Sequence, residues 1–210
     1  MITQIIFDLD GTLVDSLDTF IKIGTEMAAK YGYRSLNDEQ IKELLMLPMK
    51  KRIEILKIPI YLIPKMGIEL LSTYNAYAAQ VKPIVGVKEM LEYLHKAGYR
   101  LNIVSSNSLR NINTFLEANE LDLFDNIQSS KGLFGKNITI SKLISRLRVK
   151  KEEVIYIGDE QRDVEACKKI GIQVISVLWG FDSRELIEKA KPDFIVSNPN
   201  EIVEIIKAIK

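Results

Sequence analysis

Cysteine is almost absent from the sequence. One cysteine, Cys167, occurs among 210 residues, so no disulfide can form within the chain. Proteins of a reducing cytoplasm typically have this composition, whereas small secreted domains are often rich in disulfides. We therefore expect a cytoplasmic protein.

The sequence also has little net charge and no long apolar run. Twenty-nine basic residues against 28 acidic ones leave a formal net charge of +1. Nucleic-acid binding depends on clustered positive charge, and we therefore expect no nucleic-acid partner. The apolar run near the N-terminus ends at Asp8, far short of the ~20 residues that cross a bilayer. We accordingly expect no membrane association.

Short segments rich in β-branched residues alternate along the chain with helical patterns. The strand-like segments are residues 2–7, 101–104, 154–157, 174–178 and 194–196. Their apolar residues are nearly continuous, as in strands that are buried on both faces of a parallel sheet. The alternation predicts an α/β fold, with a Rossmann-like parallel sheet that has helices on both faces.

One stretch departs from this alternation. From residue 16 to about residue 81 the sequence has helical periodicity, with an apolar stripe that starts at Phe20, and no convincing strand. We predict that residues 16–82 form a small all-α domain, inserted after the first strand. The remaining residues, 1–15 and 83–210, would form the sheet-containing core.

The first predicted strand ends in the acidic segment Asp8-Leu9-Asp10-Gly11-Thr12. In open α/β sheets, ligands bind outside the carboxyl ends of the strands. Two aspartates at that place repel each other unless a hard cation such as Mg²⁺ lies between their oxygens. A turn rich in Asp and Gly, with no further role, is the alternative interpretation of this segment alone.

A second acidic segment follows the predicted strand 154–157. It contains Asp159, Glu160 and Asp163, and it meets the first segment if the two strands are neighbours. The alternative is that Asp159 or Glu160 only caps the following helix.

Two further segments carry groups that suit a phosphate. Ser105, Ser106 and Asn107 follow the predicted strand 101–104 and offer hydroxyl, amide and backbone N–H groups at a helix start. Lys136 lies between the second and third of these strands, next to Gly135. Taken separately, the first group is typical of a helix cap and the lysine of a solvated surface residue.

Taken together, these segments resemble the four signatures of the haloacid dehalogenase-like hydrolases, in the same order and with similar spacing. The matching residues are 7–16, 103–107, 136 and 157–163. The helical insert resembles the small α-helical cap of that superfamily. The overall pattern is most similar to its phosphoglycolate phosphatase-like members.

The resemblance implies a Mg²⁺-dependent phosphatase that acts on a small phosphorylated metabolite. Asp8 would be the nucleophile that forms an aspartyl-phosphate, and Asp10 would be the general acid and base, which favours phosphoryl transfer over dehalogenation. The implied catalytic residues are Asp8, Asp10 and Lys136. The implied phosphate ligands are Ser105, Ser106, Asn107 and Lys136. The implied metal ligands are Asp8, Asp10, Asp159 and Asp163.

The sequence departs from the family pattern at two places. Glu160 stands where the family often has a small hydroxyl residue, and residues 45–49 lack a glycine that is common in the substrate loop of the cap. The nearby cations Lys50, Lys51 and Arg52 are able to meet an anionic substrate, but we expect them to form a solvated helix face.

Other functions remain open at this point. A phosphomutase of the beta-phosphoglucomutase type shares the same signatures and a similar cap. A non-catalytic signalling module that accepts phosphate also has an acidic pocket, but it lacks a helical insert. A nicotinamide-binding fold is excluded because no Gly-x-Gly-x-x-Gly follows the first strand. We expect a monomer or a homodimer.

Overall fold

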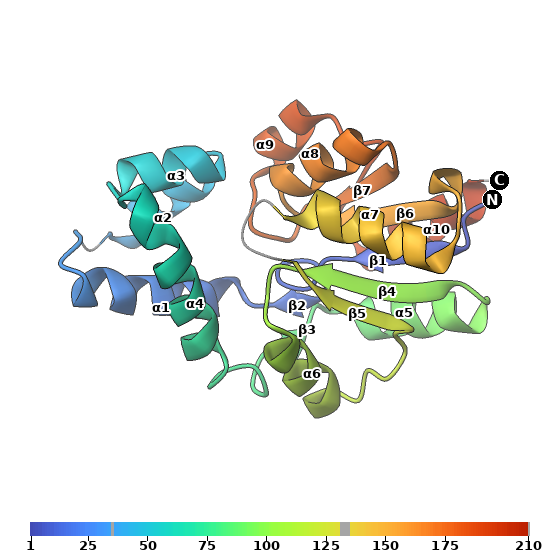
Figure 1. Cartoon of the computed structure of the whole chain (residues 1–210), viewed down its shortest axis with the longest axis horizontal. Coiled ribbons are helices and arrows are strands. Elements are labelled where there is room, and N and C mark those ends of the chain that lie inside the picture. Colours follow the sequence, from blue (N-terminus) through green and yellow to red (C-terminus); the bar gives the residue numbers. More distant parts are fainter. Residues whose placement is uncertain (35, 131–134, 210) are drawn as a thin grey trace.

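The computed structural model describes residues 1–34, 36–130 and 135–209. Its core is a parallel sheet with the strand order β5-β4-β1-β6-β7-β8 (Figure 1). The strands are β1 (Gln4–Phe7), β4 (Arg100–Ser105), β5 (Asn126–Ser129), β6 (Val154–Gly158), β7 (Gln173–Val177) and β8 (Phe194–Val196). The α/β fold class predicted from the sequence is confirmed.

The strands that the sequence did not predict are short or polar. The edge strand β5 contains one large apolar residue, Ile127, and its side chains are at most partly buried. Strands β2 (Val14–Asp15) and β3 (Lys82–Pro83) have two residues each and pair antiparallel with each other. None of these segments is long and apolar enough to produce a periodic signal.

Helices cover both faces of the sheet, and a separate apolar core lies on each face (Figure 1). Phe7 points into one core and Ile6 into the other, as alternation along a strand requires. The first core is covered by α5 (Val87–Lys96), α6 (Leu109–Ala118) and α10 (Pro199–Ala208). The second is covered by α7 (Lys136–Leu147) and α8 (Gln161–Ile170), with α9 (Arg184–Ala190) beside α8 and η2 (Lys151–Glu153) before β6.

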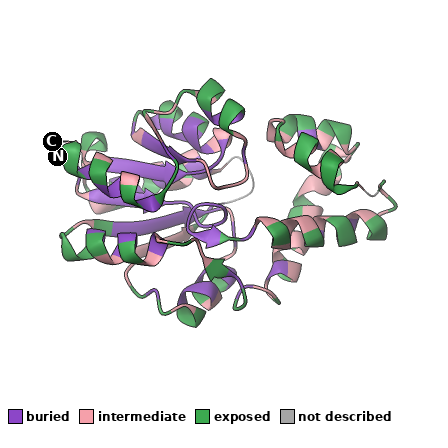
Figure 2. Cartoon of the chain, turned by 180° about the vertical axis from the view of Figure 1, so that it is seen from behind, coloured by how far each residue is buried: buried purple, intermediate pink, exposed green. Residues whose placement is uncertain are grey.

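The segment between β2 and β3 contains helices joined by turns and no strand among its described residues. It contains α1 (Leu17–Lys30), α2 (Asp38–Leu45), α3 (Met49–Ile55), η1 (Ile60–Leu62) and α4 (Ile63–Tyr74). Because β2 and β3 pair, the chain leaves the core and returns to it at one place. Figure 2 shows buried strands in the sheet and mostly exposed or half-buried helices in this segment. We call residues 16–82 the helical insert.

The helical insert is best packed where it joins the core. Tyr74, at the end of α4, is buried, and its ring stacks on that of Phe20 with centroids 4.8 Å apart. By contrast, α2 buries none of its side chains. Within the described residues, no helix is both long and apolar enough to cross a membrane.

Candidate active site at the carboxyl ends of the central strands

The register of the three central strands brings the predicted site residues to one edge of the sheet. Phe7 of β1 lies level with Ile103 of β4 and with Ile157 of β6. Since all three strands are parallel, the segments that follow them leave the sheet side by side. The acidic segments after β1 and β6 and the serine-rich segment at the end of β4 therefore meet, as the sequence predicts.

Lys136 joins the first and fourth signatures. Its Nζ forms a buried ion pair with Asp8 Oδ2 and donates to Asp163 Oδ1 at 2.5 Å. Burial lowers the pKa of Lys136, but the charges of Asp163 and Asp8 outweigh this effect, so the pKa lies above its usual value. The lysine that the sequence alone would leave on the surface is 2% exposed, and it remains charged between two carboxylates.

Asp8 has one oxygen toward the lysine and the other toward the backbone. The Leu9 N–H donates to Asp8 Oδ1 at 2.7 Å. The pKa of Asp8 lies above its usual value because burial outweighs the opposing positive charges of Lys136 and Arg162. These cations therefore favour the ionised carboxylate, which is the form that can act as a nucleophile.

Asp10 is also buried, and it contacts the second signature. The side-chain amide of Asn107 donates to Asp10 Oδ2 at 2.8 Å, and the backbone N–H of Asn107 donates to Ser105 Oγ at 3.1 Å. Burial raises the pKa of Asp10, opposed by hydrogen bonding from Asn107 and by the hydroxyls of Ser16 and Tyr74. A carboxyl group with a raised pKa suits a residue that must donate and accept a proton near neutral pH.

Asp159 is held by the loop that follows the nucleophile and by the loop that follows β7. Thr12 Oγ1 donates to its Oδ1 and the Phe181 N–H donates to its Oδ2, both at 2.8 Å. A Cβ added at Gly11 would lie 2.3 Å from Asp159 Oδ2, and one added at Gly180 would lie 2.2 Å from Asp159 Cβ. Both glycines are therefore required for Asp159 to approach the backbone this closely.

Glu160, whose role the sequence left open, lies inside the site. It is buried and forms an ion pair with Arg162, which also donates to Ser106 Oγ at 3.4 Å. Burial raises the pKa of Glu160, but Arg162 and Lys136 outweigh it, so the pKa lies below its usual value. The extra carboxylate thus holds a guanidinium next to the predicted phosphate ligand Ser106.

The donor set fits a divalent cation. One oxygen each of Asp8, Glu160 and Asp163 lies within 4.8 Å of the other two. Of the four predicted metal ligands, this group contains Asp8 and Asp163 but not Asp10 or Asp159. Burial raises the pKa of Asp159 well above its usual value, and the charges of Glu160 and Asp8 add to this effect. A cluster in which buried carboxylates outnumber cations favours a hard cation with oxygen ligands, such as Mg²⁺.

The expectation of a solvated face at residues 50–52 is wrong for one of the three cations. Lys50 and Lys51 are exposed, but Arg52 is 6% exposed and pairs with Asp182 of the core. Its guanidinium also donates to the carbonyls of Leu47 and Leu45, at 2.7 and 2.8 Å. Helix α3 turns this side chain inward, so a run of three adjacent cations does not share one face.

Asp182 joins this contact to the site. Its second oxygen, Oδ2, accepts from the backbone N–H of Gln161 at 2.7 Å, at the start of α8. Arg52 is close enough to Glu160 to lower its pKa. The Arg52–Asp182 ion pair thus connects the helical insert to the loop beside the site.

We expect that breaking this ion pair loosens the insert rather than damaging the core. Arg52→Gln and Asp182→Asn should each raise KM about tenfold, the effect of ~1.4 kcal/mol less binding free energy, with a smaller change in kcat. Steady-state kinetics of both variants and of the double variant check this, with the exposed Lys51→Gln as control. If the two single effects simply add, Arg52 does not act through Asp182.

Several residues of the site were not predicted from the sequence. They are Thr12, Arg52, Tyr74, Arg162, Gly180 and Asp182, together with Asn111 of α6, whose side chain donates to Asn107. Thr12 and Arg162 lie within the recognised signatures, two or three positions after an aspartate, and this proximity is the signal that could have identified them. The others come from the insert, α6 or the loop after β7, and no local motif marks them.

Comparisons with known proteins agree on one family. A sequence model of the family described as haloacid dehalogenase-like hydrolase matches residues 5–177. A phosphoglycolate phosphatase from Synechococcus elongatus is 31% identical over 207 residues and covers 96% of both chains. A pyrophosphatase PpaX from Anoxybacillus flavithermus is 26% identical over 217 residues, covering 98% of this chain and 97% of that protein. A haloacid dehalogenase-like family hydrolase from Streptococcus pneumoniae has a solved structure with a TM-score of 0.82, 25% identity and 98% coverage of both chains.

Proposed function

Because the chain belongs to the haloacid dehalogenase-like hydrolase family, we propose that it is a Mg²⁺-dependent phosphatase that hydrolyses a small phosphate monoester through Asp8. The observation that carries this proposal is the buried contact of Lys136 with both Asp8 and Asp163. It orients a carboxylate beside a fixed cation at the edge of the sheet where ligands bind. A purely structural role does not account for this arrangement, because a buried ion pair often stabilises a fold no more than apolar residues of similar volume.

In the first half of the proposed reaction, an oxygen of Asp8 forms a bond to phosphorus. The bond from phosphorus to the ester oxygen breaks, and Asp10 gives its proton to that oxygen as the alcohol leaves. Lys136, together with the serine hydroxyls and N–H groups at Ser105 and Ser106, would bind the phosphoryl oxygens and hold phosphorus in line with Asp8.

In the second half, Asp10 takes a proton from water as the water oxygen forms a bond to phosphorus. The bond from Asp8 to phosphorus breaks, which releases inorganic phosphate and restores the carboxylate. The family resemblance implies that Asp8, Asp159 and the backbone carbonyl of Asp10, with Asp163 nearby, would hold Mg²⁺. The structure adds Glu160 to the candidate ligands, because one of its oxygens lies close to those of Asp8 and Asp163. The bound ion would offset the repulsion between the carboxylate and the phosphate.

The helical insert, residues 16–82, would act as a cap domain over this site. The paired strands β2 and β3 form a single narrow connection to the core. The Arg52–Asp182 ion pair would hold the insert near the carboxylates, where it excludes water and contacts the substrate. Relatives named phosphoglycolate phosphatase and pyrophosphatase PpaX support a small anionic substrate.

Phosphate release from a panel of substrates tests the proposal. The panel contains phosphoglycolate, several sugar phosphates and inorganic pyrophosphate, each assayed with Mg²⁺ and with EDTA. We expect release with Mg²⁺ that falls at least ~100-fold in EDTA, since the metal supplies several kcal/mol of charge stabilisation. Isomer interconversion with a bisphosphate activator and little release would instead favour a phosphomutase. No turnover of any substrate would contradict both.

A further inference from the structure

A chain of amide hydrogen bonds runs from the helical insert to Asp10. Asn111 of α6 donates to the Leu71 carbonyl of α4 and to Asn107 Oδ1, and its own Oδ1 accepts from Asn75, each at 2.8 Å. Asn107 then donates to Asp10 Oδ2, also at 2.8 Å. Asn107 and Asn111 are both buried. The end of α4 is thus linked to Asp10 through two side chains of the core.

The direction of every bond in this chain follows from its two ends. Asp10 Oδ2 accepts when the carboxyl group is ionised and also when its proton is on Oδ1, so Asn107 presents its NH₂ group to it and its oxygen to Asn111. The Leu71 carbonyl also only accepts, so Asn111 must present its NH₂ group to both neighbours. The Ser108 N–H donates to Asn107 Oδ1 at 2.8 Å and supports the same orientation. Neither amide can rotate by half a turn without losing bonds at both ends.

The other oxygen of Asp10 also lies near the helical insert. Asp10 Oδ1, Ser16 Oγ and Tyr74 OH are buried, and within the described residues none of them has a hydrogen bond of standard geometry. The two hydroxyls are nevertheless close enough to Asp10 to lower its pKa. Ser16 precedes α1 and Tyr74 ends α4, so they belong to the two ends of the insert. Asn107 therefore holds one oxygen of Asp10, and the other oxygen lies beside Ser16 and Tyr74, at the two ends of the insert.

Helix formation does not explain an asparagine at position 111. Asparagine is a poor helix former, and the N-cap of α6 is already supplied by Ser108, whose side chain accepts from the Asn111 N–H. The neighbours of Asn111 on the buried face are the apolar residues Ile112 and Phe115. Burying an amide there costs folding free energy unless the amide is hydrogen-bonded.

We infer that Asn111 is a positioning residue for Asp10, and that it makes the orientation of this carboxyl group depend on how α4 is seated against the core. The inference rests on the proposed function, in which Asp10 protonates the leaving oxygen. When α4 is in place, Asn111 holds Asn107, and Asn107 turns Asp10 toward the ester oxygen. When α4 moves away, Asn111 loses the Leu71 carbonyl and Asn75, and Asp10 loses its fixed orientation. Proton transfer is thereby linked to the closed position of the insert.

The test compares two esters that differ in their need for an acid. An alkyl phosphate has a poor leaving group that must be protonated, whereas p-nitrophenyl phosphate releases a stable anion. For Asn111→Leu we expect kcat/KM to fall about 30-fold with the alkyl ester, part of the ~10²–10⁴-fold that a positioned acid supplies. With p-nitrophenyl phosphate kcat/KM should fall less than about threefold. The comparison uses kcat/KM because it reports the first half of the reaction, whereas kcat also contains the hydrolysis step that both esters share. Asn113→Leu, at an exposed position of the same helix, should match the wild type.

A second variant keeps the test decisive if Asn111→Leu does not fold. Asn75→Leu changes a half-buried residue at the insert end of the hydrogen-bond chain. It should lower kcat/KM for the alkyl ester about threefold relative to kcat/KM for p-nitrophenyl phosphate. Equal losses of kcat/KM with both esters, or no loss with either, would overturn the inference. Asp8→Asn distinguishes this from failure of the proposed function, because it should abolish turnover of both esters. Residual turnover in that variant would contradict the proposed function itself.

Discussion

Replacing Asp8 with asparagine is expected to reduce phosphate release by at least ~10⁴-fold, to the background of the assay. An amide oxygen is a poor nucleophile and carries no charge, so the covalent intermediate cannot form. Asparagine is nearly the same size as aspartate, so the backbone of the site is preserved. The measurement is phosphate release with the best ester of the panel in the presence of Mg²⁺.

Asp15→Asn is the matched control for this variant. Asp15 lies in the short strand β2, close to Asp8 in sequence, but its side chain is exposed. The same chemical change at that position should leave kcat within about twofold of the wild type. Intact mass measurement after rapid mixing with substrate should show a phosphorylated wild-type chain and an unmodified Asp8→Asn chain. Turnover that survives in Asp8→Asn would mean that another group attacks phosphorus.

Replacing Lys136 with methionine is expected to reduce both stability and turnover. The change leaves buried Asp8 and Asp163 without the cation that lies between them. Removing one partner of a buried ion pair typically costs ~3 kcal/mol of unfolding free energy or more. Since Lys136 would also bind phosphoryl oxygens, kcat should fall by ~10²–10³-fold. Thermal and denaturant unfolding in EDTA measure the first effect without a metal to offset the charge.

The stability defect of Lys136→Met should depend on pH. In the wild type, burial raises the pKa of Asp163 to about 6, even though Lys136 lowers it. Without the lysine this pKa rises further. A carboxyl group whose pKa is raised in the folded state contributes stability that is present at low pH and lost as the pH rises through that pKa. The difference from the wild type should therefore be small near pH 5 and largest above pH 7.

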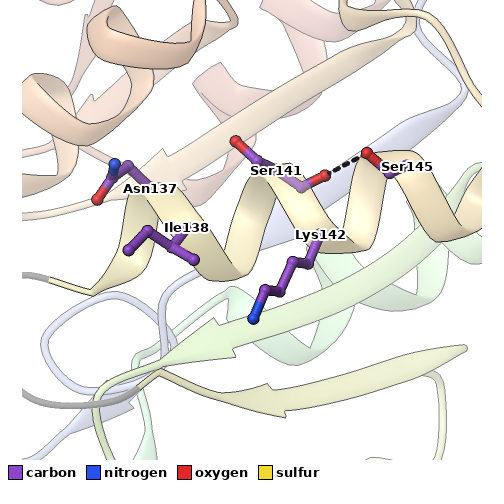
Figure 3. A pocket seen from close by; sticks show the side chains of 5 residues that line it. All are labelled: Asn137, Ile138, Ser141, Lys142 and Ser145. Atoms are coloured by element: carbon purple, nitrogen blue, oxygen red, sulfur yellow. Dashed lines mark hydrogen bonds between the residues drawn. The ribbon is translucent and has the colours of Figure 1, made fainter.

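Lys142→Met provides the control on the same helix. Lys142 is exposed, and it lines a surface hollow on α7 together with Asn137, Ile138, Ser141 and Ser145 (Figure 3). No predicted site residue lines this hollow. The control should unfold within about 0.5 kcal/mol of the wild type. Equal stability of the two methionine variants across the pH range would show that Lys136 does not compensate the buried carboxylates.

The sequence was sufficient to predict the fold class and most strands of the main sheet. Buried parallel strands carry near-continuous apolar runs, and five of the six strands of the sheet were recognised in this way. The edge strand β5 was missed because it is partly exposed and mostly polar. The helical insert was recognised because helical periodicity depends only on local spacing.

The sequence by itself also determined which chemical groups are available, since each acidic or serine-rich segment directly follows a predicted strand. Only the tertiary structure decided which of them meet. Lys136 reaches Asp8 across 128 positions of sequence, and Arg52 reaches Asp182 across 130. Asn111 likewise contacts Asn75 only because the start of α6 meets the end of α4. Such contacts depend on how the helices pack against the sheet and against one another, and not on local spacing. The roles of Arg52, Asn111 and Asp182 could therefore be inferred only from the folded structure.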